Sequence, residues 1–233
     1  MSETSSLKRN ISSDEAAIQR DRKRTNLFRG IEQPILAFLC RIMPSWVSPD
    51  MLTVVGLIGS LGVSLGFYMA KDDHRYLFIS IIAFAVQWFG DSLDGRIAVY
   101  RNAARKWYGF SLDLSVDWVS TALMGVGFYF FLDDRYKILS FVFVCSYAWT
   151  MLLAIIKFKL TDEYNIDSGL FGPTEFRLAI CSALFTEIVF PGSLLVFALV
   201  VVGVVSIINF VELGKVLKLG NERDAKERNA AKH

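Results

Sequence analysis

Six long apolar stretches follow one another along the chain, separated by short polar segments. They cover roughly residues 51–70, 76–94, 112–132, 137–157, 176–190 and 193–213. Because a helix needs about 20 apolar residues to cross the hydrocarbon core of a bilayer, the pattern predicts an all-α protein with six transmembrane helices. The fifth stretch is the shortest and holds Glu187 and Pro191 near its end, so its limits are the least defined.

The segment before the first span, from Leu27 to Trp46, has a different pattern. Its apolar residues alternate with Arg29, Glu32 and Arg41. This suits an amphipathic helix lying in the membrane interface, and a plain connecting helix remains the alternative. The pattern therefore predicts a polar tail over residues 1–26, a membrane domain over 27–213 that includes this helix, and a charged tail over 214–233.

Composition agrees with a membrane protein. Of the 233 residues, 53% are hydrophobic and 14% aromatic, and the mean hydropathy is +0.40, which is too apolar for a soluble domain. The three cysteines lie far apart in apolar runs, a spacing that fits neither a disulfide framework nor a zinc site. The net charge of +2 has no patterned basic patch behind it, so nucleic-acid binding is not expected.

Basic residues indicate the orientation of the chain. In a six-span topology, 21 of the 25 Lys and Arg residues fall in the N-terminal 50 residues, in 95–110, in 157–177 and beyond 213. The other four, Lys71, Arg75, Arg135 and Lys137, fall in two short loops on the opposite side. Because cytoplasmic loops keep the excess of Lys and Arg, both termini are predicted to be cytoplasmic.

Four aspartates lie at the facing ends of the second and third predicted spans. Asp91 and Asp94 share one face of a helix at i, i+3, and Asp113 and Asp117 share another at i, i+4. A charged residue at the centre of a membrane helix costs about 2.5 to 3.5 kcal/mol on insertion scales, so four of them need a compensating partner. The two faces, if opposed, would form a cage of carboxylate oxygens.

Such a cage fits a hard divalent cation together with pyrophosphate oxygens, and no His or Cys is near enough to favour a soft metal. Gly95 and Gly109 leave room beside the acids for a ligand or for the opposing backbone. The alternative is that the acids are solvated helix-end carboxylates, or that they pair with nearby cations. Those cations are Arg96, Arg101, Arg105 and Lys106.

These residues resemble the motif of the CDP-alcohol phosphotransferase family, which reads DxxDGxxAR, then eight residues, then GxxxDxxxD. Seven of its eight fixed positions match by type: Asp91, Asp94, Gly95, Ala98, Gly109, Asp113 and Asp117. The resemblance extends over roughly residues 45–213 and includes the six-span plan.

The sequence departs from the motif in two places. Val99 stands where the family has Arg, with Arg101 two positions later, and the stretch before Gly109 is one residue longer than usual. The segment Ser48–Thr53 is similar to the Pro-Asn-x-x-Thr that opens the first span in many members, with Asp50 in place of Asn. Arg101 is therefore the candidate to replace the missing motif arginine.

The resemblance implies a role for each matching residue. The metal ions, two Mg²⁺ or Mn²⁺, would be held by Asp91, Asp94, Asp113 and Asp117, and Asp117 would also act as the general base. The CDP group would be bound by Asp50, Thr53, Gly95, Ala98, Arg101 and Gly109. The implied protein is a phospholipid-synthesising membrane transferase that works on the cytoplasmic side, as a homodimer, and moves the phosphatidyl or phospho-alcohol group of a CDP-linked donor to a hydroxyl, with release of CMP.

The acceptor is less clearly marked. Lys157, Lys159 and Arg177 lie on the predicted cytoplasmic side of the fourth and fifth spans, and Lys159 and Arg177 are the candidates to bind an anionic acceptor such as an alcohol phosphate. Ordinary cytoplasmic loop cations, with Arg177 paired to Glu175, are the alternative. Two other functions stay open, namely transfer to an unphosphorylated acceptor such as serine, choline or ethanolamine, and, more remotely, a cation channel or transporter.

Overall fold

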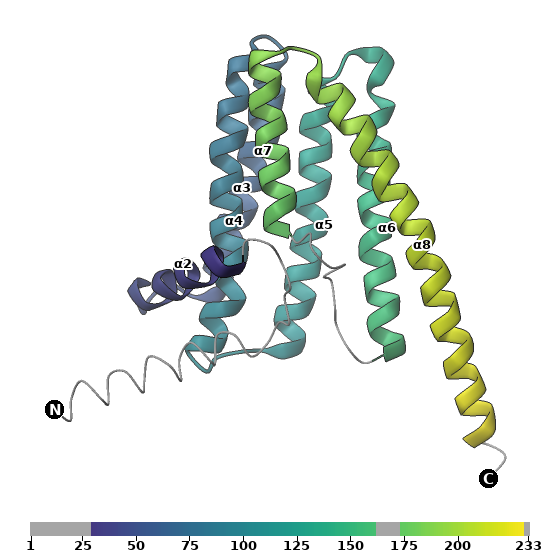
Figure 1. Ribbon diagram of the computed structural model, residues 1–233. Coiled ribbons are helices and arrows are strands. Elements are labelled where there is room, and N and C mark those ends of the chain that lie inside the picture. The colour runs from purple at the N-terminus through teal and green to yellow at the C-terminus, as the bar shows by residue number, and fades with distance from the viewer. Residues whose placement is uncertain (1–28, 162–172, 231–233) are drawn as a thin grey trace.

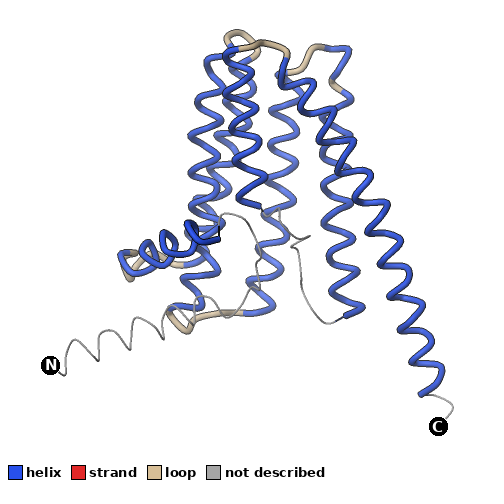
Figure 2. The backbone as a smooth tube through the Cα atoms, viewed as in Figure 1, coloured by secondary structure: helices blue, strands red, loops and turns tan. Residues whose placement is uncertain are grey.

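The computed structural model describes residues 29–161 and 173–230, and all regular structure in these ranges is helical (Figure 2). The helices are α2 (Arg29–Ile42), α3 (Pro49–Ala70), α4 (Leu77–Tyr100), α5 (Lys106–Phe131), α6 (Ile138–Thr161), α7 (Pro173–Val189) and α8 (Ser193–Ala230). Two short 3₁₀ turns, η1 (His74–Tyr76) and η2 (Asp134–Tyr136), precede α4 and α6. The predicted all-α fold is confirmed, whereas the polar tail over residues 1–26 lies outside the described ranges.

Five of the described helices are long and apolar enough to cross a membrane: α3, α4, α5, α6 and α8. The fifth predicted span corresponds to α7, which has 17 residues and is the shortest helix of the bundle. It packs against α4 and α8 and begins part-way along the bundle, while α4 and α5 extend further toward the end where α2 lies (Figure 1). The fold is that of a polytopic membrane protein, and the sixth crossing stays a prediction.

Helix α4 ends in a Schellman motif at Asn102, where the connection to α5 begins. The backbone N–H of Ala103 bonds the carbonyl of Ala98 at 2.8 Å, and the N–H of Asn102 bonds that of Val99 at 3.0 Å. Asn102 has a φ of 52°, the left-handed conformation that such a Schellman ending requires and that Asn tolerates. The connection between α4 and α5 consists of the five residues 101–105.

Helices α3 and α4 approach each other closely because glycines face one another across the contact. A Cβ on Gly90 would overlap the backbone of Gly56 and the carbonyl of Leu52, and a Cβ on Gly59 would lie 2.5 Å from the backbone nitrogen of Gln87. Small residues at a membrane helix interface let backbones pack tightly. This contact holds the part of α4 that carries Asp91 against α3.

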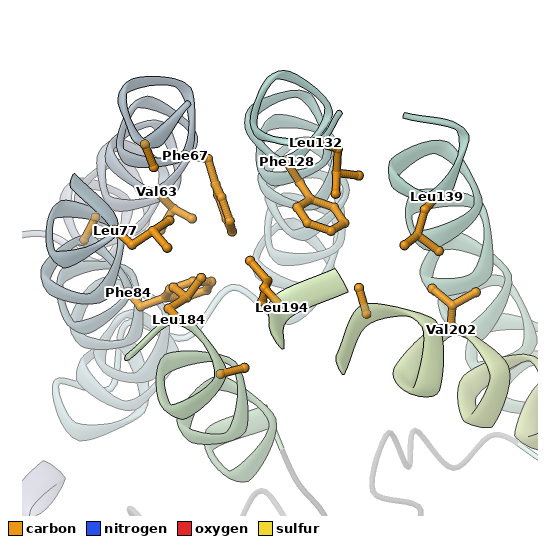
Figure 3. Packing of buried hydrophobic residues seen from close by; sticks show 14 residues of the cluster. Val63, Phe67, Leu77, Phe84, Phe128, Leu132, Leu139, Leu184, Leu194 and Val202 are labelled. Carbon is orange, nitrogen blue, oxygen red and sulfur yellow. The ribbon is translucent and has the colours of Figure 1, made fainter. Parts of the chain in front are cut away.

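A hydrophobic core joins six helices, α3 to α8, near the connections that lie away from the aspartates. It contains Phe67 of α3, Leu77 of α4, Phe128 of α5, Leu184 of α7 and Leu194 of α8, all 8% exposed or less (Figure 3). Leu77 is the first residue of α4, and Asp91 lies in the second half of this helix. The core therefore fixes the helices at one end, and the acids lie toward the other.

Glu187 is a buried acid near the end of α7, and it caps the start of α8. Its carboxylate accepts hydrogen bonds from the backbone N–H of Gly192 at 2.9 Å and of Leu194 at 2.7 Å, and His74 lies 3.4 Å away. A carboxylate at a helix N-terminus satisfies free N–H groups and interacts favourably with the helix dipole. This acid of the fifth apolar stretch is therefore part of the turn between two helices.

Helix α2 has two apolar faces. One contains Leu36 and Cys40, which pack on Leu52, Leu93 and Ile97. The other exposes a stripe at helical spacing, formed by Ile31, Ile35, Phe38 and Ile42. Helix α2 lies across the bundle (Figure 1). Because its apolar stripe is also exposed, the structure supports a helix in the membrane interface over a plain connecting helix.

Helix α8 continues well beyond the predicted end of the last span at residue 213. It stays helical through the charged segment to Ala230 and extends past the end of α6 (Figure 1). Arg223 donates hydrogen bonds to the carbonyls of Lys159 at 2.7 Å and Leu160 at 3.2 Å, which cap the last turn of α6. Most of the predicted charged tail is therefore an extension of the last helix.

Candidate active site

Three of the four motif aspartates converge between two helices. Asp91 comes from α4, and Asp113 and Asp117 come from successive turns of α5. One carboxylate oxygen from each lies within 4.8 Å of the others, and all three side chains are partly buried. The i, i+4 spacing in α5 puts its two acids on one face of the helix, as the sequence predicts.

Asp94 lies in the same pocket but is oriented by other groups. Its Oδ2 accepts a hydrogen bond of 2.7 Å from the Thr53 hydroxyl of α3, and its Oδ1 accepts one of 2.6 Å from the backbone N–H of Gly95. All four acids line one pocket. Its other lining residues are Thr53, Gly56, Gln87, Val116 and Ser120.

Gln87 is a pocket residue that the sequence reasoning missed. It lies one helical turn before Asp91, is only 5% exposed, and its Oε1 has no hydrogen-bond partner. A buried amide oxygen without a partner is costly, and here it lines the pocket of carboxylates. The available signal was the i, i+4 spacing from Asp91, which places a polar side chain on the same face of an otherwise apolar helix.

Arg177 of α7 contacts one of the acids that line this pocket. Its Nη2 lies 2.5 Å from Oδ2 of Asp91, and the two side chains are 16% and 24% exposed. Asp117 is also close enough to interact with the guanidinium electrostatically. The sequence alone marked Arg177 as an acceptor-binding candidate or a partner of Glu175, and the structure brings it to the aspartate cluster.

Beside the pocket, the first turns of α3 and α5 meet through polar side chains. Asp50 lies 2.5 Å from Nη2 of Arg105, and Tyr108 donates a hydrogen bond of 3.5 Å to the other Asp50 oxygen. The Arg105 guanidinium stacks 3.9 Å from the centre of the Tyr108 ring. The hydrogen bond that Arg105 donates to Asp50 raises the pKa of Arg105 above its usual value. Asp50, a predicted CDP-binding residue, is thus paired with a cation.

Arg101 is held elsewhere. Its guanidinium donates hydrogen bonds to the carbonyls of Met43 at 3.2 Å, Pro44 at 2.8 Å and Ser45 at 3.4 Å, and to that of Val47. These carbonyls belong to the connection between α2 and α3. The side chain that the sequence suggests as a replacement for the motif arginine therefore ties this connection to the end of α4, and it is not among the pocket residues.

The remaining predicted site residues are the small residues of the motif on α4 and α5 and the two lysines near the end of α6. Among the described residues, no atom lies within 4 Å of a Cβ added to Gly95 or Gly109, so no described backbone packs against these two glycines. Ala98 lies one turn beyond Asp94 on α4. Lys159 is exposed at the end of α6, where its carbonyl bonds Arg223, and Lys157 lies 3.8 Å from Glu212 of α8.

Comparison with known proteins agrees with the motif. The sequence pattern of the family described as CDP-alcohol phosphatidyltransferase matches residues 46–209, more than half of the chain. The chain belongs to this family. It is therefore an integral membrane transferase of phosphate-containing groups in phospholipid biosynthesis, and it acts on CDP-alcohol donors. The four acids line one pocket, whereas a transport route would spread them through the membrane.

Two crystal structures share the fold of this phosphatidyltransferase. Both are of the Mycobacterium tuberculosis phosphatidylinositol phosphate synthase PgsA1, one with CDP-DAG bound and one in complex with manganese and citrate. Each is 23% identical to this chain with a TM-score of 0.54; the first alignment covers 80% of this chain and 94% of the other, and the second covers 79% and 88%. No curated protein sequence matches.

Proposed function

We propose that this phosphatidyltransferase moves the phosphatidyl group of a CDP-linked lipid to the hydroxyl of a small polar alcohol, with release of CMP and with the help of divalent cations. The observation that carries the proposal is the convergence of Asp91, Asp113 and Asp117 within 4.8 Å, at the positions of the family motif. A relative of the same fold has been crystallised with CDP-DAG, which supports a CDP-linked lipid as the donor.

The pocket fits a hard cation. Its donors are oxygens only, and three partly buried carboxylates would repel one another without positive charge nearby. Asp91, Asp94, Asp113 and Asp117 would hold the ions, two Mg²⁺ or Mn²⁺, and the orphaned Oε1 of Gln87 would add a neutral oxygen. The manganese complex of PgsA1 supports this choice of metal. Bound there, the cations would neutralise the charge on the pyrophosphate of the donor.

Asp117 is the proposed general base. It is one helical turn deeper in α5 than Asp113 and lines the same pocket. In the reaction, its carboxylate takes the proton of the acceptor hydroxyl. The acceptor oxygen bonds the phosphorus that carries the diacylglycerol, while the bond from that phosphorus to the oxygen of CMP breaks. No covalent enzyme intermediate is needed.

The CDP group would occupy the open space beside Gly95, Ala98 and Gly109. Asp50 lies beside this space in its pair with Arg105. Thr53 contributes indirectly, because its hydroxyl already holds Asp94 at 2.7 Å. Thr53 is therefore a positioning residue for a metal-holding acid.

Two acceptor classes remain for the same reaction. Arg177, which is paired with Asp91 of the pocket, favours an anionic acceptor, such as an alcohol phosphate or a phosphorylated inositol, because a guanidinium matches phosphate geometry. Lys159 is the second candidate cation, although it lies exposed at the end of α6. Serine, choline and ethanolamine are the alternative acceptors. We place the site and both termini on the cytoplasmic side and propose a homodimer.

A panel of acceptors tests the proposal. The purified chain in detergent is given CDP-diacylglycerol and Mn²⁺ with one acceptor at a time, and CMP release and the lipid product are measured by mass spectrometry. We expect one acceptor, an alcohol phosphate, to give stoichiometric CMP and phospholipid. Product formation only with an unphosphorylated alcohol would support the alternative acceptor class, and no CMP release with any acceptor would reject the proposed reaction.

A further inference from the structure

The ion pair between Arg177 and Asp91 involves one of the proposed metal-binding acids. Asp91 belongs to the group of acids that would hold a cation, and its Oδ2 lies 2.5 Å from Arg177 Nη2. Arg177 comes from α7, whereas the acids come from α4 and α5. A helix that supplies none of these acids therefore brings a guanidinium to one of them.

Charge explains why a cation belongs at this position. Four carboxylates line one pocket, and three of them each bring an oxygen within 4.8 Å of the others. Like charges in a partly buried site repel strongly because the surroundings screen them less than water does. Arg177 offsets part of this repulsion, and Asp117 is also within its electrostatic range. The positive charge of Arg177 therefore compensates the acids in the way that a bound cation would.

We propose that Arg177 is the built-in counter-cation of the aspartate pocket, which a divalent cation displaces from Asp91, so that metal binding releases the guanidinium for an anionic group of the substrate. This inference rests on the proposed function, because it assumes that the pocket holds a metal. It adds an order of events. Arg177 is masked by Asp91 while the pocket lacks metal, and it becomes available only after the metal is bound.

Thermodynamic linkage makes the consequence measurable. If Arg177 and a divalent cation compete for Asp91, removal of the guanidinium must strengthen metal binding, whereas a merely structural Arg177 would leave it unchanged or weaken it. An anion that binds the released Arg177 must, by reciprocity, also strengthen metal binding. Typical couplings between two sites are about 5- to 150-fold, so a several-fold effect is expected.

The first experiment measures Mn²⁺ binding to the purified full chain, without donor or acceptor, by electron paramagnetic resonance of the free ion. We expect Arg177→Gln to bind Mn²⁺ at least about fivefold more tightly than wild type, and Arg177→Lys, which keeps the charge, to stay near wild type. Arg105→Gln is the matched control, since it removes a cation paired with Asp50 outside the cluster, and it should match wild type.

The outcomes separate this inference from the proposed function. Equal or weaker Mn²⁺ binding by a folded Arg177→Gln protein, with wild-type binding intact, would overturn the counter-cation role and leave the transferase proposal untouched. Failure of wild type itself to bind Mn²⁺ would contradict the metal step of the proposed function, and the inference with it. An equal gain in Mn²⁺ affinity in Arg105→Gln would show that the effect arises from the overall charge of the protein, and it would reject a specific role for Arg177.

A second measurement needs no variant. Phenylglyoxal reacts with accessible guanidinium groups, and mass spectrometry reports the extent of reaction at each arginine of the wild-type chain. We expect Arg177 to react faster with Mn²⁺ present than with a chelator, because the metal frees it from Asp91. Arg101, which bonds backbone carbonyls, should react equally in both. Unchanged or slower reaction of Arg177 with Mn²⁺ would refute the release step.

Discussion

At the residue scale, two kinds of side chain make up the site: those that line the pocket, and those that hold the lining side chains in position. The four aspartates were predictable because the helical period fixes which side chains share a face. Their partners were not, since Thr53 on α3 and Arg177 on α7 meet them only through packing of distant segments. Arg101 could not be placed either, because its partners are backbone carbonyls, which any sequence offers.

Thr53→Val tests whether a hydrogen bond to Asp94 matters. The change removes a donor at 2.7 Å and keeps the side-chain size, and a hydrogen bond to a charged group contributes about 1.5 to 3 kcal/mol. We expect kcat/KM for CMP release to fall at least about tenfold, with Thr53→Ser close to wild type. Full activity in Thr53→Val would show that Asp94 needs no such orientation.

Arg101→Ala distinguishes two roles for one residue. The structure predicts that loss of its bonds to four carbonyls loosens the connection between α2 and α3, so hydrogen exchange of residues 43–47 should speed up and the unfolding temperature should drop. The Michaelis constant of the donor should change little. If that constant instead rose about tenfold, as loss of a charge-assisted bond to a phosphate would cause, with exchange unaltered, Arg101 would replace the motif arginine after all.

At the element scale, the hydrophobic pattern of the sequence predicted which segments form helices, but it did not predict how these helices pack against one another. The spans beginning near residues 51 and 193 appear as α3 and α8, but α8 runs on to Ala230, because charged residues with good helix propensity continue a helix once the membrane no longer defines its end. The close contact of α3 and α4 was missed, since glycines in an apolar run say nothing about which helix they face.

Gly90→Ala tests this contact. A Cβ there would overlap the backbone of Gly56 and the carbonyl of Leu52, which cannot rotate away as a side chain can, so α4 must move. Overpacking of this kind costs about 1 to 3 kcal/mol. We expect a lower unfolding temperature in detergent and reduced transfer. Gly203→Ala is the control, because nothing lies within 4 Å of the added methyl group; equal stability of the two variants would contradict the close packing.

At the scale of the whole molecule, one end is fixed by the apolar core and the other carries the chemistry. Phe67, Phe128 and Leu194 hold the helices together near their connections (Figure 3), and the acids lie toward the end where α2 crosses the bundle. The family and the membrane setting were predictable from the sequence, whereas the contact of Arg177 on α7 with Asp91 depended on the three-dimensional arrangement.

Sidedness is a prediction for the whole molecule. Single cysteines are placed by Asp134→Cys and Asp224→Cys in a chain without its native cysteines, and a membrane-impermeant maleimide is applied to intact cells. Because the distribution of Lys and Arg puts the termini in the cytoplasm, position 134 should react at once and position 224 only after permeabilisation. The reverse pattern would turn the proposed orientation around.

Metal-assisted transfer in the aspartate pocket is tested most directly by CMP release from CDP-diacylglycerol. We predict that wild type loses activity in excess chelator and regains it with Mg²⁺ or Mn²⁺, and that Ala at any one of the four positions abolishes release while helix content stays. The four are Asp91, Asp94, Asp113 and Asp117. Asp72→Ala, an exposed acid in another connection, should act like wild type. Full activity in chelator, or wild-type turnover in any of the four variants, would contradict metal-assisted transfer at this site.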